Sequence, residues 1–259
     1  MSAAGTEPGG RRFEGVTAVV TGAGSGIGRA TAMRLGAEGA AVACLDVVDD
    51  NLEATVAALA GLGVEAVGRH CDVSDEADVG AAVTEVAAAL GRPGVLCNVA
   101  GIGTFAHTAD MPLATWERIL AVNLTGTFLM ARAVLPAMLE AGAGSIVNVA
   151  STSGLMGAAY SAAYCASKGG VVLFTKALAT EYAGRGVRVN AVAPGGVDTP
   201  LLANFGLPEG GDPKHIHRIT SRMGFSTPEQ VAAAIAFLAS EESAYTTGAV
   251  LAVDGGITA

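Results

Sequence analysis

Short apolar runs alternate along the chain with longer amphipathic, alanine-rich stretches. The runs have the length of buried strands and the stretches have the length of helices, which is the pattern of βα units around a parallel sheet. We predict strands at residues 16–21, 41–46, 64–70, 94–98, 145–149, 187–192 and 249–253. Helices are predicted at residues 27–38, 50–60, 75–90, 115–139, 160–182 and 227–239.

Several predicted helices begin with a recognisable signal. Ser74 is followed by two acidic residues, and Thr227-Pro228-Glu229 opens the last helix. With no repeat and no linker, we expect one domain over residues 13–259, preceded by a flexible tail at residues 1–12. Residues 194–226 lack strong periodicity and are rich in Gly and Pro. A loop this long in a compact domain is usually functional, so we interpret it as a substrate loop or lid.

The charge balance limits the classes of partner. The 259 residues carry a formal net charge of −9 and contain no basic run. Binding to nucleic acid or to an anionic membrane requires clustered Lys and Arg, so we expect neither. Residues 1–10 lack an apolar signal region, and polar residues interrupt the uncharged stretch 141–167. These features favour a cytoplasmic protein.

The cysteines and histidines do not indicate a metal site. Four cysteines lie far apart in the sequence, at Cys44, Cys71, Cys97 and Cys165. We expect buried free thiols, which suit a reducing compartment. His215-x-His217 lies in a polar loop without further ligands, and such histidines are usually solvated.

A glycine-rich turn joins the first predicted strand to the first predicted helix. It comprises Gly22, Gly24, Ser25, Gly26, Ile27 and Gly28, with a spacing that differs from the plain G-x-G-x-x-G pattern. Glycines let a backbone approach a pyrophosphate at a helix N-terminus. Glycines also form ordinary tight turns, but the position at the first strand–helix junction favours dinucleotide binding.

Asp46 ends the second predicted strand, where a carboxylate can accept hydrogen bonds from an adenosine ribose. Its charge would repel a 2′-phosphate, so NAD is favoured over NADP. A structural reading, in which Asp46 merely caps the following segment, stays open. Arg29 or Arg34 would weaken the preference for NAD if either side chain turned toward the ribose.

Tyr164 and Lys168 lie four residues apart in a predicted helix, with Ser151 thirteen positions upstream. The i,i+4 spacing places the phenol and the ammonium on one helix face. A neighbouring positive charge favours the phenolate and lowers the phenol pKa toward neutrality. A tyrosine tuned in this way can act as general acid and base.

These motifs, taken with others, carry a family resemblance. The glycine turn, Cys71-Asp72-Val73, Asn98-Val99-Ala100-Gly101, Asn123, Ser151, Tyr164-x-x-x-Lys168, Pro194-Gly195 and Val253-Asp254-Gly255-Gly256 occur in this order. From about residue 13 onward the chain resembles the classical short-chain dehydrogenases/reductases. It departs from the family pattern at Val99, where a second Asn is usual, and at Gly94, where an acidic residue is common. The first departure affects the hydrogen bonding expected around the central strand.

The resemblance implies a catalytic tetrad. Tyr164 would exchange a proton with the substrate oxygen while a hydride moves between substrate and nicotinamide. Ser151 would polarise that oxygen, and Lys168 would hold the nicotinamide ribose and lower the Tyr164 pKa. Asn123 would anchor a water that connects Lys168 to solvent. Taken alone, Ser151 could be a strand-end turn residue and Asn123 a helix residue bonded to backbone.

The resemblance also implies the residues that surround the two ligands. Beyond the glycine turn and Asp46, the expected cofactor contacts are Val47, Cys71, Asp72, Val73, Asn98, Val99, Ala100, Gly101, Val122, Tyr164, Lys168, Pro194, Gly195, Val197 and Thr199. The expected substrate pocket comprises Ser151, Ser153, Met156, Gly195, Leu201, Leu202 and Phe205. Thr152, Leu155 and residues 102–104 are expected to line its other side.

The lid composition indicates the substrate class. Apolar side chains at Leu201, Leu202, Phe205, Leu207, Ile216, Ile219, Met223 and Phe225 could close over a hydrophobic ligand, and Lys214, Arg218 and Arg222 add positive charge. We expect a bulky, mostly apolar secondary alcohol or ketone, steroid-like or cyclic. A 3-oxoacyl-thioester reductase using NADPH is the alternative, and a non-catalytic NAD-sensing protein is a further one.

The expected architecture is a single doubly wound Rossmann-type α/β domain. Its seven-stranded parallel sheet would have the strand order 3-2-1-4-5-6-7, with helices on both faces and the cofactor at the carboxyl ends of the strands where the order reverses. The long helices at 115–139 and 160–182 are apolar around much of their circumference. The resemblance therefore makes a homotetramer or a homodimer the expected assembly.

Overall fold

The computed structural model describes residues 11–259. Its seven strands form one parallel sheet in the order β3-β2-β1-β4-β5-β6-β7, which confirms the predicted topology. The strands are β1 (Thr17–Thr21), β2 (Ala41–Asp46), β3 (Ala66–His70), β4 (Pro93–Asn98), β5 (Gly144–Val149), β6 (Val187–Pro194) and β7 (Val250–Val253). All carboxyl ends therefore point to one edge of the sheet, where loops can build a site.

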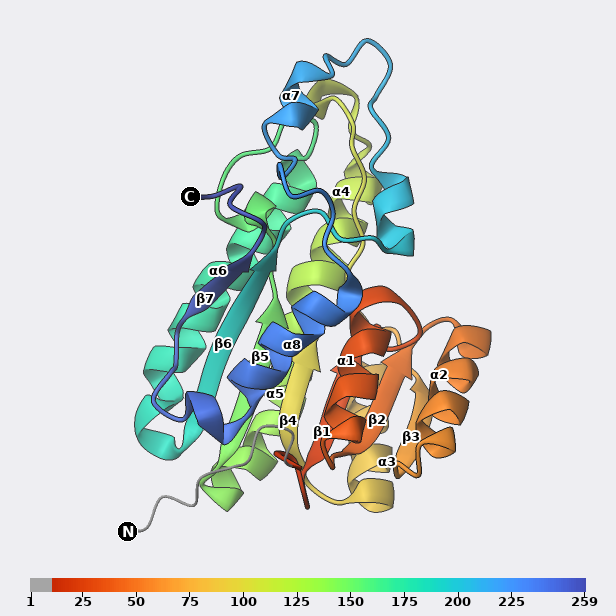
Figure 1. Ribbon diagram of the computed structural model, residues 1–259, viewed down its shortest axis with the longest axis vertical. Helices are drawn as coiled ribbons and strands as arrows, with labels where there is room; N and C mark the ends of the chain where they lie inside the picture. The colour runs from red at the N-terminus through yellow and green to blue at the C-terminus, as the bar shows by residue number, and fades with distance from the viewer. Residues whose placement is uncertain (1–10) are drawn as a thin grey trace.

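Helices cover both faces of the sheet (Figure 1). They are α1 (Gly26–Ala37), α2 (Asp49–Gly61), α3 (Glu76–Leu90), α4 (Leu113–Leu120), α5 (Gly126–Ala141), α6 (Ala162–Tyr182), α7 (Lys214–His217) and α8 (Pro228–Ala239). Helices α1, α2 and α8 pack on one face, and α3, α5 and α6 pack on the other.

Side chains of alternating strand residues pack into two separate hydrophobic cores, one on each face of the sheet. In β1, Ala18 and Val20 pack against α1 and α8, whereas Val19 packs against α3 and α5 on the opposite face. All residues of β1 are buried. Because side chains alternate across a strand, a strand covered on both faces must be apolar throughout, which is why these runs were recognisable in the sequence.

The predicted helix 115–139 is divided in the structure. Between α4 and α5 the chain forms a π-helical turn, Ala121–Thr125, that contains Asn123. Such turns insert one extra residue into a helix and re-aim a side chain, often at a functional site. The combined stretch Leu113–Ala141 is long and apolar enough to cross a membrane, but 56% of its most apolar window is buried inside the protein, as in a core helix.

The predicted helix starts are close to the observed ones. Thr227 and Gln230 form a capping box at α8, which confirms that signal. At α3 the cap is Asp75, not Ser74, because the Asp75 carboxylate accepts the N–H of Asp78 at 2.9 Å. Helix α6 begins at Ala162, two residues later than predicted, since Tyr160 adopts a left-handed φ of 64°.

The N-terminal boundary differs slightly from the prediction. Most of the predicted tail lies outside the described residues, but Arg12 belongs to the folded domain. Its guanidinium lies 2.5 Å from carboxylate oxygens of Glu38 and Glu242. These ion pairs join the chain start to the ends of α1 and α8.

The segment 194–226 rises above the carboxyl edge of the sheet (Figure 1). It contains a 3₁₀ helix, Pro200–Asn204, and the short helix α7. A β-bridge between Val197 and Ser226 closes its base. The bridge joins the two ends of the segment, for which we keep the name lid.

Candidate active site

The glycine turn at the end of β1 requires glycine for steric reasons. Gly22 has a φ of +66°, and a Cβ there would lie 2.9 Å from the Ala100 backbone. A Cβ on Gly28 would lie only 1.9 Å from the carbonyl oxygen of Gly22. The turn and the first turn of α1 are thus packed backbone against backbone, which leaves the N-terminus of α1 open to a ligand.

A first cavity of about 410 Å³ lies beside this turn, and we call it the glycine-turn cavity. It is bounded by the ends of β1, β2, β3 and β4 and by the start of the lid. Its lining residues are Gly22, Ser25, Gly26, Ile27, Gly28, Asp46, Val47, Val48, Cys71, Asp72, Val73, Val99, Ala100, Gly101, Ile102, Arg118, Val122, Thr199, Pro200, Leu201 and Asn204. Most of the predicted cofactor contacts are therefore brought together.

Asp46 lines this cavity and also supports the turn. Its carboxylate accepts the N–H of Gly24 at 2.8 Å and the N–H of Val48 at 3.0 Å. Both readings of Asp46 thus have structural support, because one oxygen organises the turn while the side chain borders the cavity. Arg34 is paired with Glu38, and Arg29 does not line the cavity.

Arg118 is a cavity residue that the sequence analysis missed. It donates to the Asp72 carboxylate at 3.1 Å and to the Ser74 hydroxyl at 2.8 Å. Asp72 and Arg118 are 46 positions apart and belong to different elements, so no local spacing indicates the pair. The only available signal was the need of a partly buried carboxylate for a cationic partner.

Gly24 and Asn98 do not line the cavity, although both were predicted cofactor contacts. The side chain of Asn98 is buried and donates to Asn148 at 2.9 Å. Thr21 accepts the N–H groups of Val99 and Ala100, both at 3.0 Å. The central strand end is thus hydrogen-bonded despite Val99, and Asn98 has a supporting role there.

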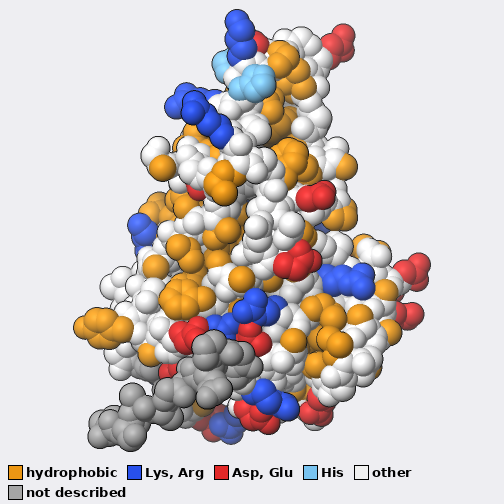
Figure 2. Space-filling view, in the orientation of Figure 1, with side chains coloured by type: hydrophobic (Ala, Val, Ile, Leu, Met, Phe, Trp, Pro, Cys, Tyr) orange, Lys and Arg blue, Asp and Glu red, His pale blue; other side chains and the backbone are white. Residues whose placement is uncertain are grey.

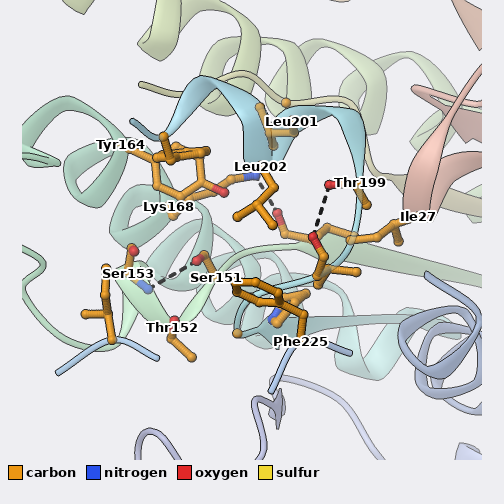
Figure 3. A pocket seen from close by; sticks show the side chains of 18 of the residues that line it. Ile27, Ser151, Thr152, Ser153, Tyr164, Lys168, Thr199, Leu201, Leu202 and Phe225 are labelled. Atoms are coloured by element: carbon orange, nitrogen blue, oxygen red, sulfur yellow. Dashed lines mark hydrogen bonds between the residues drawn. The ribbon is translucent and has the colours of Figure 1, made fainter. Parts of the chain in front are cut away.

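A second cavity of about 380 Å³ contains the predicted catalytic side chains, and we call it the tyrosine cavity. Figure 3 shows Ser151, Tyr164 and Lys168 around one space, with Leu201 and Leu202 from the lid beside them. The remaining lining residues are Ile27, Val99, Gly101, Phe105, Val149, Ala150, Thr152, Ser153, Pro194, Gly195, Gly196, Val197, Thr199, Phe205, Ile216, Ile219, Thr220 and Phe225. It shares Ile27, Val99, Gly101, Thr199 and Leu201 with the glycine-turn cavity.

Two elements position Ser151, Tyr164 and Lys168, which we call the trio. Ser151 follows the end of β5, and its hydroxyl accepts the N–H of Ser153 at 3.2 Å. Tyr164 and Lys168 lie one turn apart on α6, with the Lys168 nitrogen 5.7 Å from the Tyr164 ring centroid. The Lys168 ammonium is buried and donates to the carbonyl of Val149 at 2.7 Å. The helix and the strand end therefore bring a phenol, a hydroxyl and an ammonium to one cavity.

The expected lowering of the Tyr164 pKa is not found in the structure. Burial raises the pKa of Tyr164 to about 12, because the phenolate loses its solvation, and the hydrogen bond with Ser151 only partly opposes this. Burial also lowers the pKa of Lys168 to about 8. The Lys168 ammonium is directed to the Val149 carbonyl, and burial is the main cause of the raised Tyr164 pKa.

Asn123 lies behind the trio and lines neither cavity. Its amide accepts the N–H of Ile102 at 2.8 Å and donates to the Ile102 carbonyl at 2.9 Å and to Ser167 at 3.0 Å. Its own carbonyl accepts the hydroxyl of Thr127 at 2.8 Å. The π-helical turn thus ties the chain after β4 to α6, and a water relay from Asn123 stays a prediction.

The lid supplies an aromatic wall. The Phe205 ring meets the Tyr164 ring edge-on at 5.3 Å and the Phe105 ring at 5.0 Å. Of the predicted pocket residues, Met156 does not line the tyrosine cavity, nor do Leu155, Gly103 or Thr104. The lid residues Leu207 and Met223 also lie outside the lining, with Met223 83% exposed. Sequence periodicity could not distinguish lining from non-lining residues in the lid, because the lid has little regular structure.

The sequence analysis missed Phe105, Val149, Ala150 and Thr220 as cavity residues. Tyr160 lines neither cavity, and its hydroxyl accepts the N–H of Asp212. Cys44, Cys71 and Cys97 are buried free thiols as predicted, and burial raises the pKa of each to about 12. Over residues 11–259 no His, Cys, Asp and Glu side chains gather in a group that could hold a metal ion.

The chain is similar to known proteins over most of its length. The family model described as enoyl-(acyl carrier protein) reductase matches residues 22–258. The chain is 43% identical to 2-(S)-hydroxypropyl-CoM dehydrogenase 3 of Xanthobacter autotrophicus over 96% of this chain and 98% of that protein. It is 41% identical to the 3-oxoacyl-[acyl-carrier-protein] reductase of Thermotoga maritima over 95% and 99% of the two chains. The crystal structure of levodione reductase has a TM-score of 0.86 at 36% identity, covering 94% and 98% of the two chains.

Proposed function

The chain belongs to the short-chain dehydrogenase/reductase family, and we propose that it is an NAD(H)-dependent enzyme that interconverts a secondary alcohol and a ketone. Its relatives support an oxidoreductase that acts on CH–OH groups with a nicotinamide cofactor. The carrying observation is that Ser151, Tyr164 and Lys168 line one cavity that adjoins the glycine-turn cavity. Tyr164 is accordingly the proposed catalytic residue.

The residues present fit a dinucleotide. Gly22, Gly26 and Gly28 line the cavity where a pyrophosphate would approach the N-terminus of α1, and the cavity continues past Asp46. When bound, the nicotinamide accepts a hydride from the alcohol carbon or donates one to the ketone carbon. The glycine turn, Asp46 and Thr199 would hold the cofactor.

The side chains of this protein transfer the proton of the substrate oxygen. In alcohol oxidation the phenolate form of Tyr164 accepts the proton of the substrate hydroxyl. In ketone reduction the phenol form of Tyr164 donates a proton to the substrate oxygen. Ser151 orients that oxygen by hydrogen bonding. Lys168 must leave the Val149 carbonyl, or share it, before its charge can lower the Tyr164 pKa.

The preference for NAD(H) rests on Asp46. A carboxylate at the cavity wall can accept hydrogen bonds from the ribose hydroxyls of NAD and repels the 2′-phosphate of NADP. Arg118 also borders the cavity, but its charge is already engaged by Asp72. The position of Asp46 therefore supports NAD(H) as the cofactor.

The tyrosine cavity supports a bulky, mostly apolar substrate. Phe105, Leu202, Phe205 and Phe225 face the trio, and the polar groups among its lining side chains are hydroxyls apart from Lys168. The 3-oxoacyl-thioester reductase named above keeps the alternative substrate class open. A preference for NADPH would favour a 3-oxoacyl-thioester reductase. Cofactor binding without turnover would favour a non-catalytic NAD-sensing protein.

Side-by-side binding of NAD(H) and NADP(H) tests the proposal. A ligand bound only by the folded state raises the melting temperature, so NAD(H) should stabilise the protein more than NADP(H). Asp46→Ala should lower NAD(H) affinity roughly tenfold and reduce the discrimination, because it removes both the ribose acceptor and the Gly24 hydrogen bond. Stronger stabilisation by NADP(H) in the unmutated protein would contradict the NAD(H) assignment.

The proposal extends to the setting of the enzyme. We infer a cytoplasmic homotetramer or homodimer that binds neither nucleic acid nor membrane. Exposed apolar side chains on α5 and α6 support the assembly, with Phe128 at 40% and Leu173 at 69% exposure. A monomeric mass by light scattering would contradict it.

A further inference from the structure

A cluster of cations lies on the lid of this acidic protein. Residues 214–222, which we call the basic turn, include Lys214, Arg218 and Arg222 together with two histidines, and contain no Asp or Glu. Figure 2 shows Lys, Arg and His side chains gathered at the top of the molecule, over α7. All five of these side chains are exposed.

The charges of the basic turn have no carboxylate partner among residues 11–259. Arg12, Arg69 and Arg118 each lie within 4.0 Å of a carboxylate, whereas Lys214, Arg218 and Arg222 do not. The nearest acid in the sequence is Asp212, whose carboxylate accepts the backbone N–H of Lys214 at 2.9 Å. Three like charges therefore stand together without internal compensation.

Side-chain contacts hold the basic turn in place. Before it, the Tyr160 hydroxyl accepts the N–H of Asp212 at 2.8 Å, and the His107 ring contacts the Glu209 carbonyl at 2.9 Å. Within it, the Ser221 hydroxyl donates to the Gly255 carbonyl at 2.8 Å. The cations are thus presented from a fixed position, although their long side chains remain free to adapt.

The inner side of the same turn forms part of the tyrosine cavity. Ile216, Ile219 and Thr220 line the cavity, while the cations alternate with them on the solvent side. Inside the cavity the only cation among the lining residues is Lys168, which donates to the Val149 carbonyl. An acid group on a ligand would therefore be unpaired deep in the cavity and attracted at its rim.

We propose that the substrate is a secondary alcohol or ketone that carries an acid group, such as a carboxylate, on an apolar arm. The arm fills the tyrosine cavity, and the acid group lies at the rim against Arg218 and Arg222. This inference rests on the proposed reaction, in which the alcohol carbon loses a hydride to NAD⁺ and its oxygen loses a proton through Tyr164. The acid group is unchanged by the reaction and serves only for recognition.

A pair of substrates that differ only in charge tests this inference. We would compare 6-hydroxyheptanoate with its methyl ester, measuring kcat and KM for NAD⁺-dependent oxidation. The unmutated enzyme should have the higher kcat/KM for the acid, with a preference that weakens as salt rises. In Arg218→Gln/Arg222→Gln the acid-to-ester ratio of kcat/KM should fall roughly fivefold or more, chiefly through KM.

A matched double variant controls for net charge. Lys176→Gln/Arg185→Gln removes two exposed cations from α6 and the turn that follows it, away from the lid, and should leave the acid-to-ester ratio unchanged. Equal kcat/KM values for the acid and the ester in the unmutated enzyme would overturn the inference. The same fall of the acid-to-ester ratio in both double variants would also overturn it. If the ester is still oxidised when the charge recognition fails, the proposed alcohol oxidation still holds.

A binding measurement keeps the test independent of turnover. Calorimetric titration of the NADH complex with heptanoate and with methyl heptanoate should give tighter binding of the anion, and Arg218→Gln/Arg222→Gln should remove the difference. If neither alcohol is oxidised but the anion still binds more tightly, the charge recognition holds and the reaction assignment fails. Equal binding of both compounds contradicts the recognition.

Discussion

The two cavities are built in different ways. The glycine-turn cavity is formed by backbone, since Gly22 and Gly28 leave no room for a Cβ and the strand ends form its walls. The tyrosine cavity has one wall at the end of β5 and on α6, with the side chains of Ser151, Tyr164 and Lys168, and a second wall made of lid side chains such as Phe205 and Phe225. The lid contacts the rest of the protein through single hydrogen bonds and ring contacts.

This difference separates what the family shares from what one enzyme selects. A cofactor common to many enzymes can be held by a backbone shape that admits almost no substitution. A substrate is selected by side chains on a loop, where replacements change the shape of a pocket without unfolding the sheet. Variants on the two sides should therefore fail in different ways.

Tyr164→Phe should give the largest effect, because it removes the proposed proton-transfer group from the tyrosine cavity. We expect turnover to fall by about 10²–10⁴-fold while NAD(H) affinity stays nearly unchanged. Steady-state kinetics and calorimetric titration would measure the two quantities. Unchanged turnover would refute the catalytic role of Tyr164.

Gly28→Ala should destabilise the fold and impair the cofactor side. Its Cβ would lie 1.9 Å from the Gly22 carbonyl oxygen, so the backbone must move, at a cost of roughly 1–3 kcal/mol or more in the free energy of unfolding. Stabilisation by NAD(H) should also be lost in thermal melts. Gly80→Ala in α3 is the matched control, since a Cβ there meets nothing within 4 Å. Normal NAD(H) binding by Gly28→Ala would show that the turn tolerates a side chain.

Lys168 should make stability depend on pH. Its pKa is about 8 in the folded protein, below the ordinary value of 10.5, because its ammonium is buried. Between pH 8 and 10 the unfolded chain therefore binds more protons at this residue, and the free energy of unfolding rises with pH. We expect its contribution to rise by about 2–3 kcal/mol over that window.

Urea unfolding of the unmutated protein and of Lys168→Met isolates this contribution. The thiols at Cys44, Cys71 and Cys97 act in the opposite direction above pH 9, since burial raises their pKa, but they affect both proteins equally. The difference in the free energy of unfolding should grow in favour of the unmutated protein from pH 8 to pH 10. A difference independent of pH would mean that Lys168 is not buried as an ammonium.

Phe205→Leu should have the smallest effect and should act on the substrate side only. It removes an edge-on ring contact with Tyr164, worth about 0.5–1.5 kcal/mol. Water can then reach the phenol, so the kcat profile for alcohol oxidation should shift to lower pH, while NAD(H) affinity is retained. Leu207→Ala is the control on the same lid, as Leu207 is 41% exposed and does not line the cavity. The same pH profile in all three proteins would show that Phe205 does not influence Tyr164.

Much of the fold was predictable because buried parallel strands are apolar on both faces. The seven strands and their order agreed with the sequence-based expectation, whereas the helix at 115–139 did not remain continuous. Helical periodicity describes side chains along one helix and carries no information on the contact between Asn123 and Ile102 that accompanies the π-helical turn.

The sequence by itself determined the sheet, the glycine turn and the Ser151, Tyr164 and Lys168 trio, since each depends on local spacing or on residue types that few environments accept. Tertiary structure alone decided that Arg118 pairs with Asp72, that Lys168 donates to Val149, and that Phe205 and not Met156 faces the cavity. These contacts join residues from separate elements, and their energies depend on burial. The elevated pKa of Tyr164 has the same origin, because desolvation exists only once the lid and α6 have packed together.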